Sequence, residues 1–304
     1  MKVLSLFDGM SCGRIALDRI GVNVEGYFAS EIDKNAVKCS KYNWGDIVHI
    51  GDVTKVSYEA GILYTEFGEF ETQIDLLIGG SPCQDFSSAK VFNSSNKNGY
   101  GLEGEKSSLF YHYLRIKKEI ERENPSLKFL LENVKMKKES KKELDDYLGV
   151  EGVYINSELL SFQKRPRYYW SNLVFDVPGD RKIFFQDYKE TGELGEYKLK
   201  PTPSRIRMWN DGKGRTSVKN CPNVTLSDKV YCLTTNQDRC PNSGLVEYED
   251  FCRYLTQNEL EMAQTVPLGY TACLSYRQAC AVLGNGWTVD VIAHILKSLK
   301  GEIK

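Results

Sequence analysis

The chain has 304 residues, of which 41% are hydrophobic and 27% charged, and its formal net charge at pH 7 is −1. This composition suits a soluble globular protein of one large or two modest domains, and the net charge by itself does not indicate a nucleic-acid binder. We find no apolar run long enough to cross a bilayer, and the start, "MKVLSLFDGM", does not predict a signal peptide.

The nine cysteines are odd in number and contain no C-x-x-C pair. This pattern argues against a disulfide framework and against a zinc ribbon, so we expect reduced thiols and a cytoplasmic location. The three histidines, at positions 49, 112 and 294, lack the spacing of a metal site. No metal is therefore predicted.

Strands and helices alternate through the first half of the chain. Apolar strand patterns occupy 2–7, 24–31, 47–53, 74–80, 128–134 and 169–175. Helices are predicted from Ser11, which can cap, to Gly21, and over 37–44 and 108–123. This order predicts an α/β fold, a Rossmann-like sheet with helices on both faces.

The composition changes after residue 175. Residues 176–250 are rich in Gly, Pro, Asn, Thr and charge, with short β-like pieces such as "VYCLTT" at 230–235. We predict a small irregular lobe there, followed by helices over 254–266, 275–284 and 288–300. Thr256 and Glu259 have the spacing of a capping box at the start of the first of these helices.

Polar residues follow five of the predicted strands. They are Asp8, Glu31, Asp52, the segment 81–84 and Glu132-Asn133. A single acid after a strand is usually a cap or turn residue. Five such clusters indicate instead a ligand site at the carboxyl edge of the sheet, where open α/β sheets bind their ligands.

The loop "FDGMSCG" and the acids at this edge suggest the class of ligand. The loop is not G-x-G-x-x-G and has no Walker lysine, so a bound pyrophosphate is poorly supported. Asp8 would repel phosphate but could hold an ammonium group, Glu31 could accept from ribose hydroxyls, and Asp52 could accept from an exocyclic amine. Together these acids describe a nucleoside that carries a cation, such as S-adenosylmethionine.

Cys83 follows Pro82 and the end of a strand, in "GGSPCQDFS". A lone cysteine is more often a buried packing residue. Here Glu132 ends the next strand, and Arg165 and Arg167 occur together in "QKRPRYYW". Positive charge near a thiol favours the thiolate. A thiolate with a carboxylic acid and an arginine suits conjugate addition to an electron-poor ring.

A local excess of positive charge lies between residues 200 and 220. Six basic residues stand there against a single acid, Asp211. The segment is either a solvated loop or a face that contacts phosphates.

Several of these motifs occur together and in order: "LSLFDGMSCG", "ASEID", "GDV", "GGSPCQDFS", "ENV", "QKRPR", "RYLTQNELEMAQTVP" and "GNGWTVDVIAHIL". The chain therefore resembles the DNA (cytosine-5)-methyltransferases. "LSLFDG" and "CLTT" look most like the catalytic domain of the vertebrate de novo enzymes, and solitary bacterial or phage enzymes would be similar. The chain departs from the family in a first motif that is poorer in glycine and in a small recognition lobe.

The resemblance implies transfer of a methyl group to C5 of a cytosine flipped out of double-stranded DNA. Cys83 would attack C6 of the base and Glu132 would donate to ring N3. Arg165 would hold the base O2, and Arg167 would support the loop or a phosphate. The loop 85–105 would close over the DNA.

The resemblance also assigns binding residues and domains. Contacts to S-adenosylmethionine, with S-adenosylhomocysteine as product, are expected from Phe7, Asp8, Gly9, Met10, Ser11, Cys12, Glu31, Ile32, Asp52, Val53, Gly80, Pro82, Asn285, Gly286 and Trp287. The candidate DNA contacts are Ser87, Arg205, Arg207, Lys213, Arg215, Thr234, Thr235, Asn236, Gln237 and Arg239. Residues 1–175 and 272–304 would form the catalytic domain and 176–271 the target-recognition domain. A cognate restriction endonuclease is an expected partner, and the oligomeric state stays open.

Three alternatives remain at this point. One branch of the family methylates tRNA and has a similarly small lobe. Some relatives are inactive accessory proteins, although these lose the nucleophile or the cofactor acids, which are present here. A nicotinamide oxidoreductase is disfavoured because the phosphate-binding glycine pattern is missing.

Overall fold

The computed structural model describes residues 1–81, 108–211, 223–239 and 241–302, and it divides into two compact units. Unit 1 consists of Met1–Ile155, Pro166–Val177 and Ile292–Lys304. Unit 2 consists of Asn156–Arg165 and Pro178–Val291.

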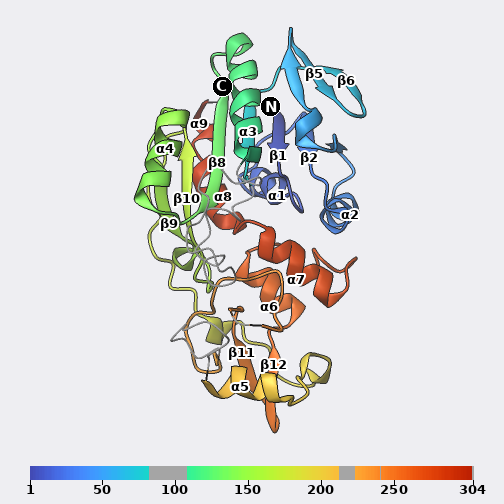
Figure 1. Ribbon diagram of the computed structural model, residues 1–304, viewed down its shortest axis with the longest axis vertical. Helices are drawn as coiled ribbons and strands as arrows, with labels where there is room; N and C mark the ends of the chain where they lie inside the picture. The colour runs from blue at the N-terminus through green and yellow to red at the C-terminus, as the bar shows by residue number, and fades with distance from the viewer. Residues whose placement is uncertain (82–107, 212–222, 240, 303–304) are drawn as a thin grey trace. The chain divides into compact units, whose positions relative to one another are not determined.

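Unit 1 is built on a seven-stranded sheet in the order β3-β2-β1-β7-β8-β10-β9 (Figure 1). The strands are β1 (Lys2–Leu6), β2 (Gly26–Ser30), β3 (Ile47–His49), β7 (Leu76–Gly79), β8 (Lys128–Val134), β9 (Val153–Asn156) and β10 (Pro166–Ser171). The strands from β3 to β8 are parallel, and β10 pairs antiparallel with β8. The predicted α/β sheet is therefore confirmed, with an antiparallel strand at one side.

The helices of unit 1 follow the strands, as expected of an α/β sheet. They are α1 (Cys12–Arg19), α2 (Lys34–Asn43), α3 (Ser108–Glu123), α4 (Lys138–Leu148) and α9 (Leu299–Glu302). Sequence patterns explain several boundaries. Asp33 caps α2 by accepting from the backbone N–H groups of Asn35 and Ala36, and α3 and β8 have the predicted bounds because their apolar patterns are unbroken. Central β7 is buried at every position, as a strand covered on both faces should be.

A small three-stranded antiparallel sheet interrupts this alternation between β3 and β7. It consists of β4 (Ser57–Glu59), β5 (Ile62–Thr65) and β6 (Gly68–Glu71), joined in the order β4-β5-β6. Sequence analysis does not predict this β4–β6 meander. Its strands are three or four residues long and half exposed, so they carry a weak hydrophobic pattern.

Unit 2 has less regular structure. It contains α5 (Pro203–Asp211), the hairpin β11 (Leu245–Tyr248) and β12 (Phe251–Tyr254), α6 (Gln257–Ala263) and α7 (Tyr276–Asn285). The predicted capping box of Thr256 and Glu259 is present on α6. The predicted β-like piece 230–235 forms only an isolated bridge between Val230 and Gln163. Short 3-10 turns occur at Val53–Lys55 in unit 1 and at Ser157–Leu159, Phe185–Asp187 and Gly195–Tyr197 in unit 2.

The end of the chain belongs to both units. Helix α8 (Val289–Leu296) begins in unit 2 and ends in unit 1. Sequence analysis groups residues 272–304 with the first part of the chain, whereas residues 272–291 cluster with unit 2. By length and composition alone, Tyr276–Leu296 could cross a membrane, but 72% of its apolar window is buried in the fold. That burial is what core helices of a globular fold show.

Candidate active site

The loop between β1 and α1 has an unusual backbone. Phe7, Gly9 and Ser11 all have positive φ, at 58°, 61° and 65°. Two of the three are not glycine, and such conformations in a short loop are often associated with a ligand site. Met10 and Cys12 are buried at 0% and 2% exposure, so their side chains belong to the core. A ligand at this loop would meet backbone groups rather than those two side chains.

Asp8 lies within this loop and is buried. Its Oδ1 accepts from the hydroxyl of Tyr27 at 2.7 Å, and its Oδ2 accepts from Ser11 at 2.5 Å. Ser11 was predicted to cap α1, but its hydroxyl makes no cap bond and is directed to Asp8 instead. Burial raises the pKa of Asp8 to about 6, with the nearby Glu31 carboxylate adding to the effect and the hydroxyl donors opposing it.

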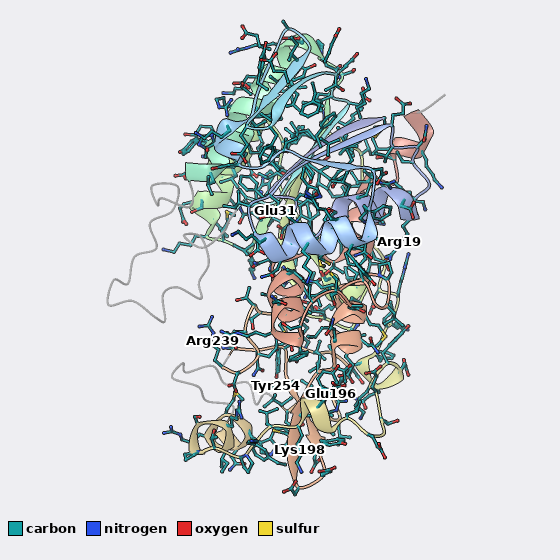
Figure 2. All side chains as sticks on the ribbon, turned by 90° about the vertical axis from the view of Figure 1, so that its right-hand side faces the viewer. Arg19, Glu31, Glu196, Lys198, Arg239 and Tyr254 are labelled. Carbon is teal, nitrogen blue, oxygen red and sulfur yellow. The ribbon has the colours of Figure 1, made fainter. Side chains whose placement is uncertain are left out.

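Glu31, labelled in Figure 2, follows the end of β2 and is fixed there by backbone hydrogen bonds. Its Oε2 accepts from Gly9 N at 2.8 Å, and its Oε1 accepts from Ile32 N and Asp33 N at 2.8 Å each. The side chain of Ile32 is 73% exposed. At the end of β3, Asp52 Oδ1 accepts from Thr54 N at 2.9 Å, and Val53 is buried. The predicted acids of β1, β2 and β3 therefore lie at one sheet edge.

These residues fit S-adenosylmethionine chemically. Oε2 of Glu31 accepts only one of the three backbone bonds, so it keeps an acceptor site that a ribose hydroxyl could use. Asp52 keeps one carboxylate oxygen, and Ile32 offers an exposed apolar side chain for a flat base. Among the residues that the structure describes, no ion pair to Asp8 is present, and both of its oxygens accept from hydroxyl groups.

The ends of β7 and β8 are joined by side chains. Gly79 pairs with Leu131 in the parallel register, so Glu132 and Asn133 follow directly beside Gly80 and Ser81. Asn133 Nδ2 donates to Ser81 Oγ at 3.1 Å, and both residues are buried. Ser81 is two residues before Cys83 in the sequence. Cys83 itself, Pro82 and Ser87 lie outside the described residues.

Glu132 forms a buried ion pair with Arg167. Arg167 Nε lies 2.7 Å from Glu132 Oε1, and the side chains are 13% and 11% exposed. In the antiparallel register Tyr169 is opposite Glu132, and Arg167 is two residues from Tyr169. The two charged side chains are therefore diagonal neighbours on one face of the sheet. Of the two arginines in "QKRPR", Arg167 is the one that contacts the predicted acid.

Arg165 instead holds unit 2 together. Its guanidinium donates to the carbonyls of Gly286 at 2.8 Å, Gly284 at 3.1 Å and Leu233 at 3.4 Å, and the residue is 3% exposed. Sequence analysis places Arg165 on the base O2. Within unit 2 its donors go to backbone carbonyls of the 232–234 segment and of the end of α7.

Gln163 and Gln264 complete this buried network and were not selected from the sequence. Gln163 Nε2 donates to the carbonyl of Ala263 and to Gln264 Oε1, while its own Oε1 accepts from Leu233 N. Gln264 Nε2 donates to Leu283 O and Gly286 O. The sequence signal that could have identified Gln163 is its place as the first residue of "QKRPR". A buried glutamine must find hydrogen-bond partners for its amide.

Three of the expected cofactor residues stand at the end of α7 in unit 2. Asn285 is exposed, Gly286 accepts the bonds just described, and Trp287 is 8% exposed. Gly80, in unit 1, is partly buried after β7.

The candidate nucleic-acid contacts differ in their exposure and in whether their side chains already bond within the protein. Arg207, Thr235 and Arg239 are exposed, and Figure 2 shows Arg239 at the surface of unit 2. Arg205 pairs with Asp238 at 2.8 Å. Gln237 is 5% exposed and uses its amide to bond Thr234 O and Ser243, so it holds the loop together. Thr234 donates to Asn236 O, and Lys213 and Arg215 lie outside the described residues.

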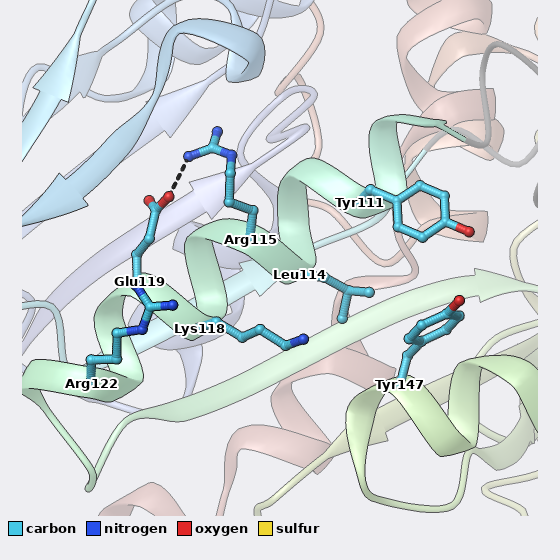
Figure 3. A pocket seen from close by; sticks show the side chains of 7 residues that line it. All are labelled: Tyr111, Leu114, Arg115, Lys118, Glu119, Arg122 and Tyr147. Carbon is cyan, nitrogen blue, oxygen red and sulfur yellow. Dashed lines mark hydrogen bonds and ion pairs between the residues drawn. The ribbon is translucent and has the colours of Figure 1, made fainter.

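A pocket of about 300 Å³ lies elsewhere in unit 1, between α3 and α4 (Figure 3). It is lined by Tyr111, Leu114, Arg115, Lys118, Glu119, Arg122 and Tyr147. None of the predicted site residues lines it, so it is separate from the acids at the sheet edge.

Comparison with known proteins gives a family for the first half of the chain. The family model of the C-5 cytosine-specific DNA methylase matches residues 1–150. The orphan methyltransferase M.SPRI of Bacillus phage SPR is 38% identical over 137 residues, which are 44% of this chain and 26% of that protein. The DNA (cytosine-5)-methyltransferase DRM1A of Oryza sativa subsp. japonica is 35% identical over 122 residues, 38% of this chain and 24% of that protein. The matches thus span about a quarter of these relatives.

Solved structures agree at the level of the fold. The Entamoeba histolytica methyltransferase EhMeth has a TM-score of 0.68 at 16% identity, covering 100% of this chain and 99% of that one. The S. pombe Dnmt2 methyltransferase has a TM-score of 0.68 at 16% identity, covering 100% of both chains. Residues 1–150 of this chain therefore match the C-5 cytosine-specific DNA methylase family, whose members use S-adenosylmethionine as methyl donor.

Proposed function

We propose that this protein transfers a methyl group from S-adenosylmethionine to C5 of a cytosine in double-stranded DNA. The observation that carries this proposal is the joined end of β7 and β8. There Glu132, paired with Arg167, lies next to the segment that leads into Pro82-Cys83. The family match over residues 1–150 includes this whole arrangement except Arg167.

The proposed chemistry begins with the nucleophile. The cytosine is flipped out of the duplex, because the stacked base hides its ring carbons. The thiolate of Cys83 adds to C6, which makes C5 nucleophilic. After C5 is methylated, loss of its proton to a base and expulsion of the Cys83 sulfur restore the aromatic ring and the enzyme. Cys83 therefore ends each turnover unchanged.

Glu132 and Arg167 would act on the base together. Glu132 would donate a hydrogen bond to ring N3, and Arg167 would orient the Glu132 carboxyl through the 2.7 Å contact. We therefore assign to Arg167 the role next to the base that the sequence analysis gave to Arg165, which is to hold O2. Arg165 becomes a positioning residue, because it bonds backbone carbonyls inside unit 2.

Bound S-adenosylmethionine would supply an electrophilic methyl group on its sulfonium. Phe7 to Ser11 would present backbone groups to it, Glu31 would hold the ribose hydroxyls, and Asp52 the base amine. In unit 2, Arg207, Thr235 and Arg239 are the proposed nucleic-acid contacts, since they are exposed. Gln237 drops out of this group because its amide is already bonded inside the loop.

The proposal is tested with labelled S-adenosylmethionine, offering duplex DNA and tRNA side by side. We expect label in DNA as 5-methylcytosine, and sequencing of the modified sites gives the recognition sequence. Transfer to tRNA alone would replace DNA by tRNA as the substrate. No transfer to either, by a folded protein, would favour an inactive accessory role.

A substitution of Cys83 tests the proposed nucleophile separately. Cys83→Ser should lose methyl transfer, because a serine hydroxyl is a far weaker nucleophile at neutral pH, while S-adenosylhomocysteine still binds. Cys280→Ser serves as the matched control, since Cys280 is buried in α7 and burial raises its pKa to about 11. Full turnover by Cys83→Ser would refute the assigned nucleophile.

A further inference from the structure

The turn between β5 and β6 reaches the sheet edge that carries the cofactor acids. We propose that its residues Glu66 and Phe67 form the outer wall of the site for the nucleobase of the cofactor, with Phe67 as a binding and specificity residue. This inference rests on the proposed function, because it assumes that an adenosyl ligand is held by Glu31 and Asp52.

Glu66 and Phe67 lie directly against the end of β3. A Cβ atom built on Gly51 would stand 1.8 Å from Glu66 Oε1 and 2.8 Å from Phe67 Cε2. Gly51 also has a φ of +76°, so a side chain there would be both strained and blocked. Glu66 Oε1 accepts from Asp52 N at 3.3 Å. The turn thus occupies the space beside the residue that precedes Asp52.

Phe67 is held in place by its backbone while its ring stays exposed. Thr65 Oγ1 accepts from Phe67 N at 3.1 Å and donates to Gly68 O at 2.9 Å, which closes the turn. The side chain of Phe67 is 67% exposed. A fixed, exposed aromatic ring contributes little to the folded state, but it can lie against the face of a ligand ring.

A second exposed apolar side chain stands at the neighbouring strand end. β2 and β3 are paired in parallel, and Ser30 Oγ donates to Gly51 O at 2.8 Å. Ile32, two residues after Ser30, is 73% exposed. Ile32 from β2 and Phe67 from the turn therefore flank the end of β3, where Asp52 and Glu66 both offer carboxylate oxygens. An apolar surface with acceptors suits a flat base that carries an amine.

The meander that carries this turn is anchored at its other end to α3. Arg115 donates to Val56 O at 2.6 Å, and Glu119, which pairs with Arg115, accepts from Tyr58 N at 2.9 Å (Figure 3). Glu123 accepts from Ala60 N at 2.5 Å and Gly61 N at 2.6 Å. These bonds fix the meander against the sheet, so the position of Phe67 is determined before any ligand binds. Preorganisation of this kind lowers the cost of binding.

The test measures binding of S-adenosylhomocysteine to the full chain by calorimetry. Stacking of an aromatic side chain on a base predicts about tenfold weaker binding for Phe67→Ala. Phe67→Tyr keeps the ring and should restore affinity to within about twofold of the wild type. Tyr42→Ala is the matched control, because Tyr42 is 62% exposed on α2 and has no part in this site; its affinity should equal that of the wild type.

The outcomes separate the inference from the function on which it rests. If the wild type does not bind S-adenosylhomocysteine, the proposed function fails first. If the wild type binds and Phe67→Ala binds equally well, the nucleobase wall is refuted while the proposed function stands. A loss in Phe67→Ala that Phe67→Tyr does not recover also contradicts stacking. An unchanged KM for S-adenosylmethionine in Phe67→Ala would contradict it in turnover.

Discussion

Among the residues of the site, Asp8 destabilises the folded protein when it is ionised, because its carboxyl is buried. Burial raises the pKa of Asp8 from 3.8 to about 6, so the folded state favours its protonated form. The stabilisation that comes from protonated Asp8 is complete below about pH 4 and is lost as the pH rises through 6. Between pH 5 and pH 7 the free energy of unfolding should fall by about 1 kcal/mol from this group. Urea unfolding without ligand measures it.

Asp8→Asn isolates the contribution. The asparagine oxygen can accept from Tyr27, and its amide can donate to Ser11, whose hydroxyl lies 2.7 Å from Ser40 Oγ. The variant keeps the shape and removes the titration, so the decrease between pH 5 and pH 7 should be smaller than in the wild type by that amount. Parallel pH profiles of the two proteins would mean that Asp8 does not titrate in this range.

The arginine pair shows what a residue pattern can and cannot predict. "QKRPR" indicates that two arginines come near the predicted acid, and Arg167 does contact Glu132. Which arginine does so depends on β10 running antiparallel to β8 with Tyr169 opposite Glu132. Sequence alone does not contain that register, so the roles of Arg165 and Arg167 could not be distinguished.

At the scale of elements, the start of α6 depends on one buried ion pair. Both terminal nitrogens of the Arg253 guanidinium lie 2.8 Å from the carboxylate of Glu259, and the two side chains are 1% and 0% exposed. Glu259 also accepts from Thr256 N and Glu190 N. Arg253→Met leaves this carboxylate buried without its cation, so we expect a loss of about 3–5 kcal/mol in urea unfolding.

A second arginine of unit 2 provides the control for this prediction. Arg205 pairs with Asp238, but these side chains are 25% and 47% exposed. Arg205→Met should therefore cost only about 0–1 kcal/mol, because water already screens the pair. Similar losses in both variants would show that burial does not set the strength of the Arg253 pair.

The bounds of a helix or strand could be predicted from the sequence where one continuous hydrophobic pattern sets them. The bounds of α3 and β8 agree with the sequence because each pattern is long and continuous. Residues 230–235 look like a strand, but backbone partners are found at Val230 and Tyr231, whereas Leu233 bonds the side chains of two other residues, Gln163 and Arg165. A pattern of apolar residues cannot show that side chains, rather than a strand, will satisfy the backbone.

For the whole molecule, the order of motifs predicts more than composition does. The parallel sheet and its polar edge followed from strand–helix alternation, and the family that matches residues 1–150 was indicated by motifs spread along the chain. The β4–β6 meander could not be expected from that order, although it reaches the end of β3 through Glu66. Its alternation is short and its turns at Ala60-Gly61 and Glu66-Phe67 lie between half-exposed strands.

The proposed nucleic-acid binding would have to come from local charge, since the net charge of the chain is only −1. Arg207 and Arg239 are exposed, so they can bind phosphates. Removing one arginine that binds a phosphate should reduce the slope of log K against log salt concentration by about 0.9. The double variant Arg207→Ala/Arg239→Ala should therefore bind duplex DNA more weakly, with a slope lower by about 2. Fluorescence anisotropy at several salt concentrations measures both.

The control for this experiment is another exposed arginine. Arg122 lies in the last turn of α3, whose first turn follows the carboxyl end of β7, so it stands toward the opposite edge of the sheet from the proposed site. Arg122→Ala should leave the slope unchanged. If Arg122→Ala lowers it by about 0.9, as one arginine of the double variant should, binding follows total charge and not a phosphate-binding face on unit 2. If neither lowers it, the phosphates must be bound by other residues, and the assignment of Arg207 and Arg239 fails.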